Sequence, residues 1–404
     1  MKEVYTAIPQ EEVLNVEETQ TETMIIEKSK RLNNVKEYYF STKLKEIRNL
    51  ITEGKPIINL GIGSPDIAPP TKVIEAISEA IKSKKNHSYQ SYQGLPEFRT
   101  AIAEFYQRHY TVKLNSKTEI LPLMGSKEGI MHISMAFLNE GDEVLIPNPG
   151  YMTYTSVTKL LKAKPIHYKL KQENNWYPDI EALEKLDLRK VKIMWLNYPN
   201  MPTGSVATKE LFERLITFAR KHQILLVNDN PYSFVLNQKP LSILSVKGAK
   251  EVAIELNSLS KTYNMAGWRV GMLLGKAAYI KTVLQVKSNM DSGMFYGIQK
   301  GAIAALEITN GWFDKMNKIY QDRREIVWQI LDKINCKYDK KSVGLFVWAK
   351  IPEGIKSEDL TDKLLYEKDV FITPGTIFGT KGEGYIRVSL CVNETQLKEV
   401  LKRV

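Results

Sequence analysis

The sequence predicts an α/β protein in which helices cover both faces of a mostly parallel sheet, followed by a smaller α+β domain. Short apolar runs alternate with amphipathic stretches between about residues 57 and 290, which is the pattern of strands and helices in parallel sheets. Beyond about residue 300, a long amphipathic stretch precedes separate strands and helices. The length of 404 residues is enough for two domains.

The individual elements follow this alternation. Helical periodicity appears first at 29–49, and an apolar run at 57–60 leads into the glycine-containing turn 61–66. Buried strands are predicted at 143–146, 192–196, 224–227, 252–256 and 271–274, and helices at 72–82, 96–109, 128–138, 152–161, 208–221 and 276–289. The C-terminal part is predicted to hold a strand at 344–349 and helices at 313–334, 357–368 and 393–403. Because ligands collect at the carboxyl ends of parallel strands, we expect a site in the turns after these runs.

Composition argues against several classes of protein. Two cysteines, Cys336 and Cys391, have no CxxC spacing, and the five histidines form no metal-binding pair, so we expect neither a disulfide scaffold nor a metal. The net charge of +11 comes from lysines spread along the chain rather than from a basic stripe, so we expect no nucleic-acid partner. There is no apolar run of membrane-spanning length and no signal-peptide segment, so we expect a cytoplasmic protein without membrane contact.

The stretch that begins Ser258-Leu-Ser-Lys261 and continues to Arg269 is the most informative part of the sequence. Lys261 follows an apolar run, has two serines before it, and is followed eight residues later by the arginine. A solvated surface charge explains a lysine in this position poorly. Pyridoxal phosphate requires an amine for its aldehyde and fixed positive charge for its phosphate, and this stretch offers both. A structural alternative, in which Arg269 only caps a strand, explains Arg269 by itself. It does not explain why Ser258, Ser260 and Lys261 occur beside it.

Further motifs lie in the turns around this stretch. Gly125-Ser-Lys-Glu-Gly129 opens a helix directly after an apolar run, and backbone N–H groups at a helix N-terminus bind phosphate. The others are Tyr89-Gln-Ser-Tyr92-Gln-Gly94, Pro149-Gly-Tyr151, Asn197-Tyr-Pro-Asn200-Met201-Pro-Thr-Gly204, Asp229-Asn-Pro-Tyr232 and Gly384-Tyr-Ile-Arg387. Taken one at a time, each also fits a structural role such as a helix start, a capped turn or core packing.

In order and spacing, these motifs resemble the class I/II aminotransferase family of fold-type I pyridoxal-phosphate enzymes, over about residues 30–404. The resemblance implies a three-layer large domain and a smaller α+β domain formed by both chain ends. The implied division is an acidic N-terminal arm at 1–30, a small-domain part at 31–70, a large cofactor-binding domain at 71–299 and a C-terminal small domain at 300–404.

The resemblance also implies a role for each motif residue. Lys261 would form the Schiff base and move the proton, Asp229 would keep the ring nitrogen protonated, and Tyr232 would bind the ring's 3′ oxygen. Tyr151 would stack on the ring. The phosphate would be held by the backbone of the turn Ser126, Lys127 and Glu128, and by Ser258, Ser260, Arg269 and Tyr89 of the partner subunit. Arg387 would pair with the substrate carboxylate, near Gly63 and Tyr92, in a homodimer with shared sites.

Two departures from the family pattern bear on the site. Met201 stands where an asparagine normally precedes Pro-Thr-Gly, and a thioether cannot donate a hydrogen bond. Either Asn200 swings in or Tyr232 makes the contact with the 3′ oxygen alone, and we expect the second. Segment 288–296 lacks the arginine with which one branch of aspartate transaminases binds a distal carboxylate. Recognition of an anionic side chain by Lys127, or of an aromatic one by Tyr92 or Tyr296, stays open.

We therefore expect a homodimeric aminotransferase that moves the amino group of an L-amino acid to a 2-oxo acid, with 2-oxoglutarate as acceptor, by a ping-pong mechanism. A carbon–sulfur β-lyase of the same fold is the nearest alternative, because it needs the same lysine as a base. A non-enzymatic cofactor-binding regulator is a third reading. Residues 1–30 are too short and too acidic for the DNA-binding module that such a protein carries.

Overall fold

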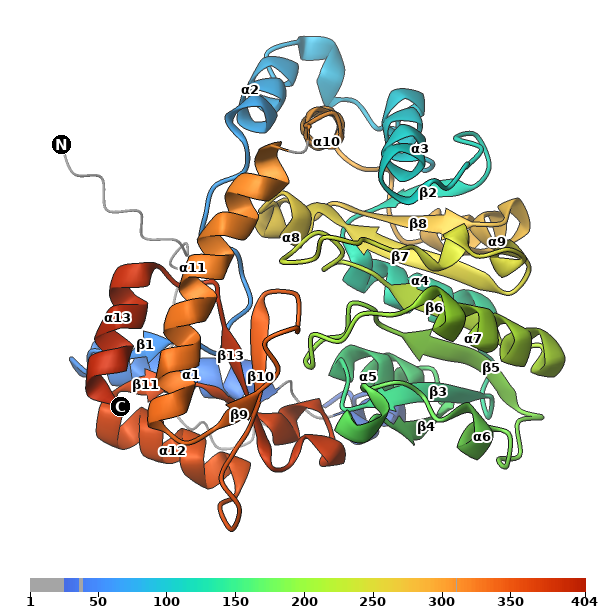
Figure 1. Cartoon of the computed structure of the whole chain (residues 1–404). Coiled ribbons are helices and arrows are strands. Elements are labelled where there is room, and N and C mark those ends of the chain that lie inside the picture. Colours follow the sequence, from blue (N-terminus) through green and yellow to red (C-terminus); the bar gives the residue numbers. More distant parts are fainter. Residues whose placement is uncertain (1–24, 36–38, 310) are drawn as a thin grey trace.

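The computed structural model describes residues 25–35, 39–309 and 311–404. A larger part with a central sheet lies beside a smaller part that contains both the first long helix and the C-terminus (Figure 1). The predicted acidic arm at 1–30 falls mostly outside the described residues. The predicted α/β fold is confirmed, and so is the smaller domain built from both ends of the chain.

In the described residues, seven strands form the central sheet of the larger part. Their order is β2-β8-β7-β6-β5-β3-β4, and all run parallel except β8, which is antiparallel to both of its neighbours. Their bounds are β2 (Ile120–Leu123), β3 (Glu143–Asn148), β4 (Lys164–Lys169), β5 (Val191–Leu196), β6 (Leu225–Asp229), β7 (Ala253–Ser258) and β8 (Gly271–Gly275). Except for β4, these strands are buried almost throughout, as expected for a sheet covered on both faces.

Helices cover both faces of this sheet. One face packs against α4 (Ser126–Phe137), α5 (Met152–Leu160) and α9 (Ala277–Lys287). The other face packs against α3 (Pro96–Tyr110) and α7 (Lys209–His222). The helices α7 and α3 end in left-handed residues, Gln223 and Thr111, which close the last helical turns before the chain returns to the sheet.

Helix α10 (Tyr296–Leu306) packs against α2 (Thr71–Ala80) and α3 at the edge of the larger part. The sequence did not predict α10, since Gly297 and Gly301 lower helix propensity within it. Both glycines allow close packing, because a Cβ on Gly301 would lie 3.0 Å from the Trp268 ring. The predicted domain boundary between residues 299 and 300 falls inside this helix.

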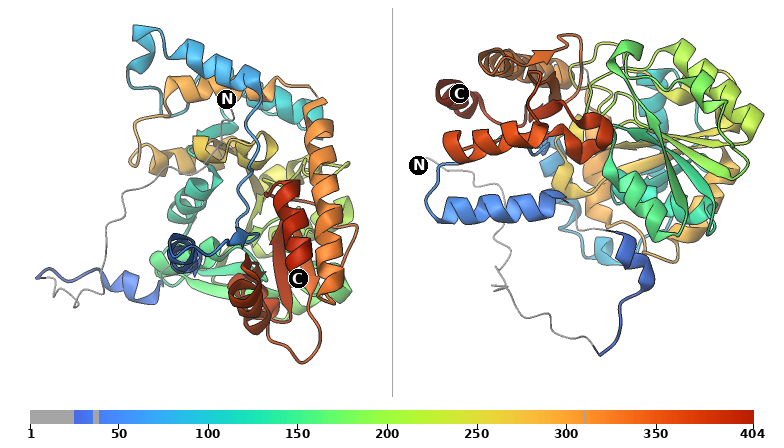
Figure 2. Two further views of the ribbon diagram at one scale, coloured as in Figure 1. Left: turned by 90° about the vertical axis from the view of Figure 1, so that its left-hand side faces the viewer. Right: turned by 90° about the horizontal axis from the view of Figure 1, so that it is seen from below.

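The smaller part joins the two ends of the chain. The N-terminal strand β1 (Ile58–Asn59) pairs with β11 (Val370–Phe371), more than 300 residues later. A second sheet has the order β12-β13-β10-β9, with bounds of Thr373–Pro374, Tyr385–Ser389, Phe346–Lys350 and Lys337–Tyr338. The long helix α11 (Gly311–Lys333) and α13 (Glu394–Arg403) pack together. Helix α1 (Tyr39–Thr52) lies beside α12 (Ser357–Lys368) (Figure 2).

The remaining helices are short. Two are α-helical, α6 (Ile180–Leu183) and α8 (Leu259–Thr262). The others are 3-10 turns: η1 (Lys30–Asn34), η2 (Lys84–His87), η3 (Gln172–Asn174), η4 (Ile243–Ser245), η5 (Ala249–Glu251), η6 (Ala266–Trp268), η7 (Gly375–Phe378) and η8 (Thr380–Gly382). The predicted helical stretch 29–49 therefore divides into η1 and α1. Among the described residues, none of the helices is long and apolar enough to serve as a membrane span.

Candidate active site

A cavity of about 380 Å³ lies where the carboxyl ends of the central strands face the smaller part. The turns that follow β2, β3, β5, β6 and β7 all contribute to its wall, as the parallel topology predicts. Residues from the central sheet side are Ser126, Lys127, Tyr151, Tyr154, Asn197, Met201, Asp229, Pro231, Tyr232, Ser258, Ser260, Lys261, Ala266 and Arg269. Those from the smaller part and its connecting turn are Leu44, Gly61, Ile62, Gly63, Ser64, Phe346, Phe378 and Arg387.

Lys261 lies on α8, one turn after the end of β7, and its side chain points into the cavity. Its Nζ donates a hydrogen bond to the carbonyl oxygen of Gly63 at 2.5 Å. Burial lowers the pKa of the Lys261 ammonium, and the positive charges of Arg387 and Arg269 lower it further. A lysine in this setting holds its proton less tightly than a surface lysine, so it is suited to act as a nucleophile or a base.

One end of the cavity is built to hold an anion. Ser126 is the first residue of α4, whose first-turn N–H groups have no partners within the helix. Arg269, which has a φ of 57°, brings its guanidinium to the same place. Gly125 has a φ of 89°, and a Cβ there would lie 2.1 Å from Arg269 Nη2, so only glycine fits. The hydroxyl-bearing residues Ser258 and Ser260 line the cavity beside Arg269.

Asp229, the last residue of β6, is buried against the cavity. Its Oδ2 accepts a hydrogen bond from the Tyr154 hydroxyl at 2.8 Å, whereas its Oδ1 is buried without a hydrogen-bond partner. Burial raises the pKa of the Asp229 carboxyl group to about 7, although the Tyr154 hydrogen bond opposes this shift. Asn197 Nδ2 donates to the backbone oxygen of Asp229 at 2.6 Å and so fixes the end of the strand. A buried oxygen without a partner is costly, and it marks a place for a ligand donor.

Tyr154 is a site residue that the sequence analysis missed. It stacks on Trp195, with 4.7 Å between the ring centroids and an interplanar angle of 8°. Its ring meets that of Tyr151 edge-on, at a centroid distance of 5.6 Å. The signal available was the spacing: Tyr154 follows Tyr151 by three residues, which brings both side chains near one face of a helix.

Arg387 forms the opposite end of the cavity from β13. Its guanidinium lies over the ring of Phe346 at 3.9 Å and over that of Phe378 at 4.6 Å. Arg387 Nη2 donates to the carbonyl oxygen of Gly61 at 2.7 Å, and Nη1 approaches Met201 Sδ at 3.4 Å. Two aromatic faces, a carbonyl and a thioether hold a planar cation in one orientation, which is what bidentate binding of a carboxylate requires.

The turn 197–204 places Met201 and Asn197, rather than Asn200, in the cavity wall. The side-chain oxygen of Asn200 accepts hydrogen bonds from the Thr203 amide and hydroxyl, at 3.3 and 2.8 Å, which keep it within the turn. Asn197 was not singled out in the sequence. Its side-chain oxygen accepts from the Met201 amide at 2.8 Å, while its amide group holds Asp229 as described above. Tyr232 does line the cavity, next to Phe346.

Four of the residues expected at the site lie outside the cavity wall of this chain: Tyr89, Tyr92, Glu128 and Asn200. Tyr89 and Tyr92 stand on the loop before α3 and are 90% and 46% exposed. The side chain of Glu128 is not in the cavity wall, since its carboxylate accepts hydrogen bonds from the Met124 amide at 2.6 Å and from His132 at 2.9 Å. The contact implied for Glu128 was through its backbone, at the first turn of α4. The other sequence-predicted residues, Gly63, Ser126, Lys127, Tyr151, Asp229, Tyr232, Ser258, Ser260, Lys261, Arg269 and Arg387, come together around the cavity.

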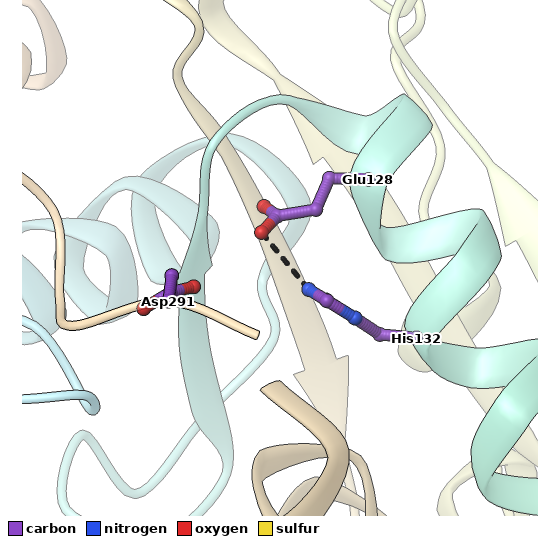
Figure 3. Close-up of side chains that lie close together, drawn as sticks. All are labelled: Glu128, His132 and Asp291. Carbon is purple, nitrogen blue, oxygen red and sulfur yellow. Dashed lines mark hydrogen bonds and ion pairs between the residues drawn. The ribbon is translucent and has the colours of Figure 1, made fainter. Parts of the chain in front are cut away.

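Glu128 and His132 also lie near Asp291 (Figure 3). One potential ligand atom from each residue falls within 4.8 Å of the others, a spacing that a metal ion can use. The ammonium of Lys287, however, lies 2.8 Å from Asp291 Oδ2. A buried positive charge therefore already neutralises this carboxylate, and the group carries no metal assignment.

Comparisons with known proteins agree with this geometry. Residues 55–404 match the family described as "Aminotransferase class I and II". The LL-diaminopimelate aminotransferase of Aquifex aeolicus is 39% identical over 382 residues, which cover 94% of this chain and 99% of the relative. The enzyme of the same name from Oleidesulfovibrio alaskensis is 41% identical over 377 residues, covering 93% and 97%.

The fold of this chain is also similar to that of solved structures. The apo structure of BacF from Bacillus subtilis superposes with a TM-score of 0.89 at 35% identity, over 94% of this chain and 98% of that one. The match of nearly the whole chain includes both the central sheet and the smaller part that supplies Arg387. The chain therefore belongs to the class I and II aminotransferase family and is an aminotransferase.

Proposed function

We propose that this aminotransferase uses pyridoxal phosphate bound at Lys261 to move the amino group of an L-amino acid to 2-oxoglutarate in a ping-pong cycle. The observation that carries this proposal is the convergence, in one cavity, of Lys261, Asp229, Arg269 and Arg387 from four separate parts of the chain. The family to which the chain belongs depends on this cofactor. Each of the four side chains matches a different chemical requirement of cofactor or substrate.

The cavity residues fit pyridoxal phosphate. The partnerless Asp229 Oδ1 suits a protonated ring nitrogen, which would supply the missing donor. Ser126, Ser258, Ser260 and Arg269 would hold the phosphate, and Tyr151 and Tyr232 would flank the ring. When bound, pyridoxal phosphate supplies an aldehyde for an amine and a ring that withdraws electrons from the α-carbon of the amino acid.

The chain's own residues would then bind and orient the substrate. Arg387 would take the α-carboxylate in a bidentate pair and so fix the direction of the Cα–H bond, because the arginine itself is clamped between two aromatic rings. The Lys261 amine would accept the Cα proton and return it at the aldehyde carbon of the cofactor, on the other side of the substrate nitrogen. Its lowered pKa supports this role, since a neutral amine is needed to accept a proton.

The single arginine at the substrate end of the cavity wall, Arg387, supports a ping-pong cycle. Amino donor and oxo acceptor both carry a carboxylate next to the reacting carbon, so they would use Arg387 in turn rather than together. The named relatives act on LL-diaminopimelate, which makes this amino acid the first donor to test. Lys127, which also lines the cavity, would be placed to meet a second, distal carboxylate.

We also propose that the active form is a homodimer with shared sites. Tyr89 is 90% exposed on a loop that does not contribute to its own chain's cavity. Large apolar side chains are also exposed on neighbouring segments, including Ile81, Met290 and Phe295. Exposed apolar side chains near one loop favour an interface, and a second copy of the chain would cover them.

A donor panel with 2-oxoglutarate tests the function. Glutamate and a new 2-oxo acid are expected from LL-diaminopimelate or another L-amino acid, with borohydride trapping the cofactor at Lys261. Lys261→Ala should lower kcat by at least about 10³-fold, while Lys276→Ala, at an exposed lysine, serves as the matched control. Pyruvate and ammonia formed from cysteine-type substrates without an acceptor would instead support the β-lyase alternative.

A further inference from the structure

The loop that carries Tyr89 and Tyr92 is held more firmly than its exposure suggests. It runs from η2 to α3, and its aromatic side chains face solvent in this chain. Its backbone is fastened to the segment between α9 and α10 by two buried polar side chains, Lys287 and Gln299. An exposed loop needs no such fastening for its own stability.

Lys287 is the last residue of α9 and is 1% exposed. Its ammonium donates to the carbonyl oxygen of Tyr92 at 3.2 Å and to Asp291 Oδ1 at 2.9 Å. The same carboxylate oxygen accepts the Gly293 amide at 2.8 Å. Removing an ammonium from water costs several kcal/mol unless it is paired, so the Asp291 carboxylate is what allows Lys287 to reach the loop from within the protein.

Gln299 on α10 makes the second fastening and is fully buried. Its side-chain oxygen accepts the Leu95 amide at 2.7 Å, and its nitrogen donates to the Met294 carbonyl at 2.6 Å. The two backbone groups lie on the two different segments. Gln299 therefore ties the end of the tyrosine loop to the segment between the helices.

Gly293 shows how closely the two segments approach. Its φ of 88° is a conformation that favours glycine, and a Cβ there would lie 2.4 Å from the carbonyl oxygen of Gln90. The segment between α9 and α10 therefore packs directly against the backbone between Tyr89 and Tyr92. We call Lys287, Asp291 and Gln299 the brace. The Glu128–His132 pair lies beside Asp291 (Figure 3), so the brace is next to the first turn of α4, at the anion-binding end of the cavity.

We propose that Lys287 and Gln299 are positioning residues that act on the site of a second copy of the chain. They hold the loop of residues 89–95 in the shape with which Tyr89 enters the partner's cavity. Ordering such a loop at the moment of binding would cost conformational entropy, and a pre-ordered loop avoids this cost. This inference rests on the proposed homodimer and on the proposed transaminase activity.

Hybrid dimers test whether the effect acts across subunits. Lys287→Met and Lys261→Ala subunits, with different affinity tags, are co-expressed, and the hybrid is purified with its cofactor. If Lys287 acts on the partner's site, one site of the hybrid contains only native residues, so its activity should be about half that of the wild type. The Lys287→Met homodimer should lose at least about tenfold in kcat/KM, as expected for a misplaced contact.

Two further measurements keep the test independent of one variant's folding. Gln299→Leu should behave as Lys287→Met does, and Lys281→Met, an exposed lysine on the same helix, should leave activity unchanged. Hydrogen exchange of amides 88–95 should quicken in both brace variants but not in the control. A hybrid no more active than the Lys287→Met homodimer would place the defect within one subunit and overturn the inference.

The outcomes separate this inference from the proposed function. A wild type that transfers no amino group from any donor refutes the function, whereas the hydrogen-exchange result still reports on the brace. A wild type that is active but monomeric by light scattering leaves the transaminase in place and refutes the action across subunits. An active dimer whose exchange at 88–95 is unaffected by Lys287→Met refutes the brace itself.

Discussion

Asp229 shows how a single residue can be arranged for a ligand at the expense of stability. Its carboxylate is buried, one oxygen is held by Tyr154 and the other has no partner. Without a ring nitrogen to face, the folded chain favours the protonated form, and the pKa of about 7 expresses this preference. Burial and the oxygen without a partner destabilise the ionised carboxylate in the empty cavity. They also make it a strong acceptor for a protonated ring nitrogen.

This arrangement predicts a pH-dependent gain in stability from Asp229→Asn in the cofactor-free protein. Below the ordinary pKa of 3.8 both folded and unfolded states carry the proton, and the carboxyl group costs nothing. Between pH 3.8 and about pH 7 only the unfolded chain releases the carboxyl proton. The loss of folding stability caused by Asp229 therefore grows with pH, and it reaches on the order of 4 kcal/mol above pH 7. Urea unfolding at pH 5 and pH 8 should show the advantage of the variant increasing by about 2–3 kcal/mol. Asp359→Asn, at an exposed carboxylate, is the control, and an equal advantage at both pH values would contradict the account.

Met201 makes a second prediction at the residue scale. It contacts Arg387 and stands in the cavity wall, where it offers no hydrogen-bond donor. Met201→Asn should add a donor near the cofactor's ionised oxygen and lower, by about one pH unit, the pH at which the visible absorbance of the cofactor-bound enzyme changes. Met201→Leu keeps the volume without adding a donor and should leave the transition in place. An unshifted transition in Met201→Asn would contradict the effect of the missing donor and leave Tyr232 as a sufficient partner.

The residues predicted from the sequence are mainly those whose chemistry is rare outside a site. Lys261 follows a buried strand, and Asp229 and Arg387 stand within one, where a charge is otherwise costly. Arg269 is exposed and was predicted from its spacing to Lys261. Asn200 and Tyr154 could not be assigned this way. Whether Asn197 or Asn200 faces the cavity depends on the hydrogen bond between Asn200 and Thr203 within the turn. Tyr154 binds Asp229, which lies 75 residues later in the sequence. The spacing of Tyr154 from Tyr151 indicates a shared side of the chain, but the contact with Asp229 and the direction of Asn200 arise from tertiary packing.

At the scale of elements, the turn between β1 and α2 is held by an ion pair. Arg323 on α11 donates two hydrogen bonds to the carboxylate of Asp66, at 2.7 and 2.8 Å, and a third to the Leu390 carbonyl. The turn that ends at Asp66 carries the carbonyl oxygens that meet Arg387 and Lys261. Its position therefore depends on α11, far from the cavity in sequence.

The two partners of this ion pair should not be equivalent. The side chain of Arg323 is 6% exposed and that of Asp66 is 30% exposed. Asp66→Ala leaves a buried guanidinium without its partner and should cost about 3–5 kcal/mol in unfolding free energy. Arg323→Met leaves a carboxylate that water can still reach, so its cost should be smaller by at least about 1 kcal/mol. Urea unfolding of both variants checks the order, and a larger loss in Arg323→Met would refute the explanation.

Long helices were predicted more accurately from the sequence than an edge strand or a glycine-containing helix. Long amphipathic helices such as α7 and α12 lie within a residue or so of their predicted ranges, because burial of one face sets their periodicity. Strand β4 and helix α10 were missed. The exposed residues of β4 interrupt its apolar pattern at the sheet edge, and the glycines of α10 hide a helix that is stabilised by its packing against α2 and α3.

At the scale of the whole molecule, the cavity exists only when both parts of the chain are folded against each other. Arg387, Phe346 and Phe378 come from the smaller part, whereas Ser126, Asp229 and Lys261 come from the turns of the central sheet. The smaller part is itself closed by the β1–β11 pairing of the two chain ends. A ligand that fills the cavity therefore stabilises the whole fold rather than one element.

The two ends of the cavity should contribute differently to this stabilisation. At a free cofactor concentration of 100 times Kd, pyridoxal phosphate should raise the unfolding free energy of the wild type by about 2.7 kcal/mol. Arg269→Met removes a cation at the anion-binding end, so a tenfold weaker affinity should reduce this increment by about 1.3 kcal/mol at the same concentration. Arg387→Met removes the substrate-binding cation and should lower the stability of both forms equally, leaving the increment within about 0.5 kcal/mol of the wild type. Urea unfolding with and without the cofactor measures each increment. Equal losses in the two arginine variants would mean that the cavity does not divide into a cofactor end and a substrate end.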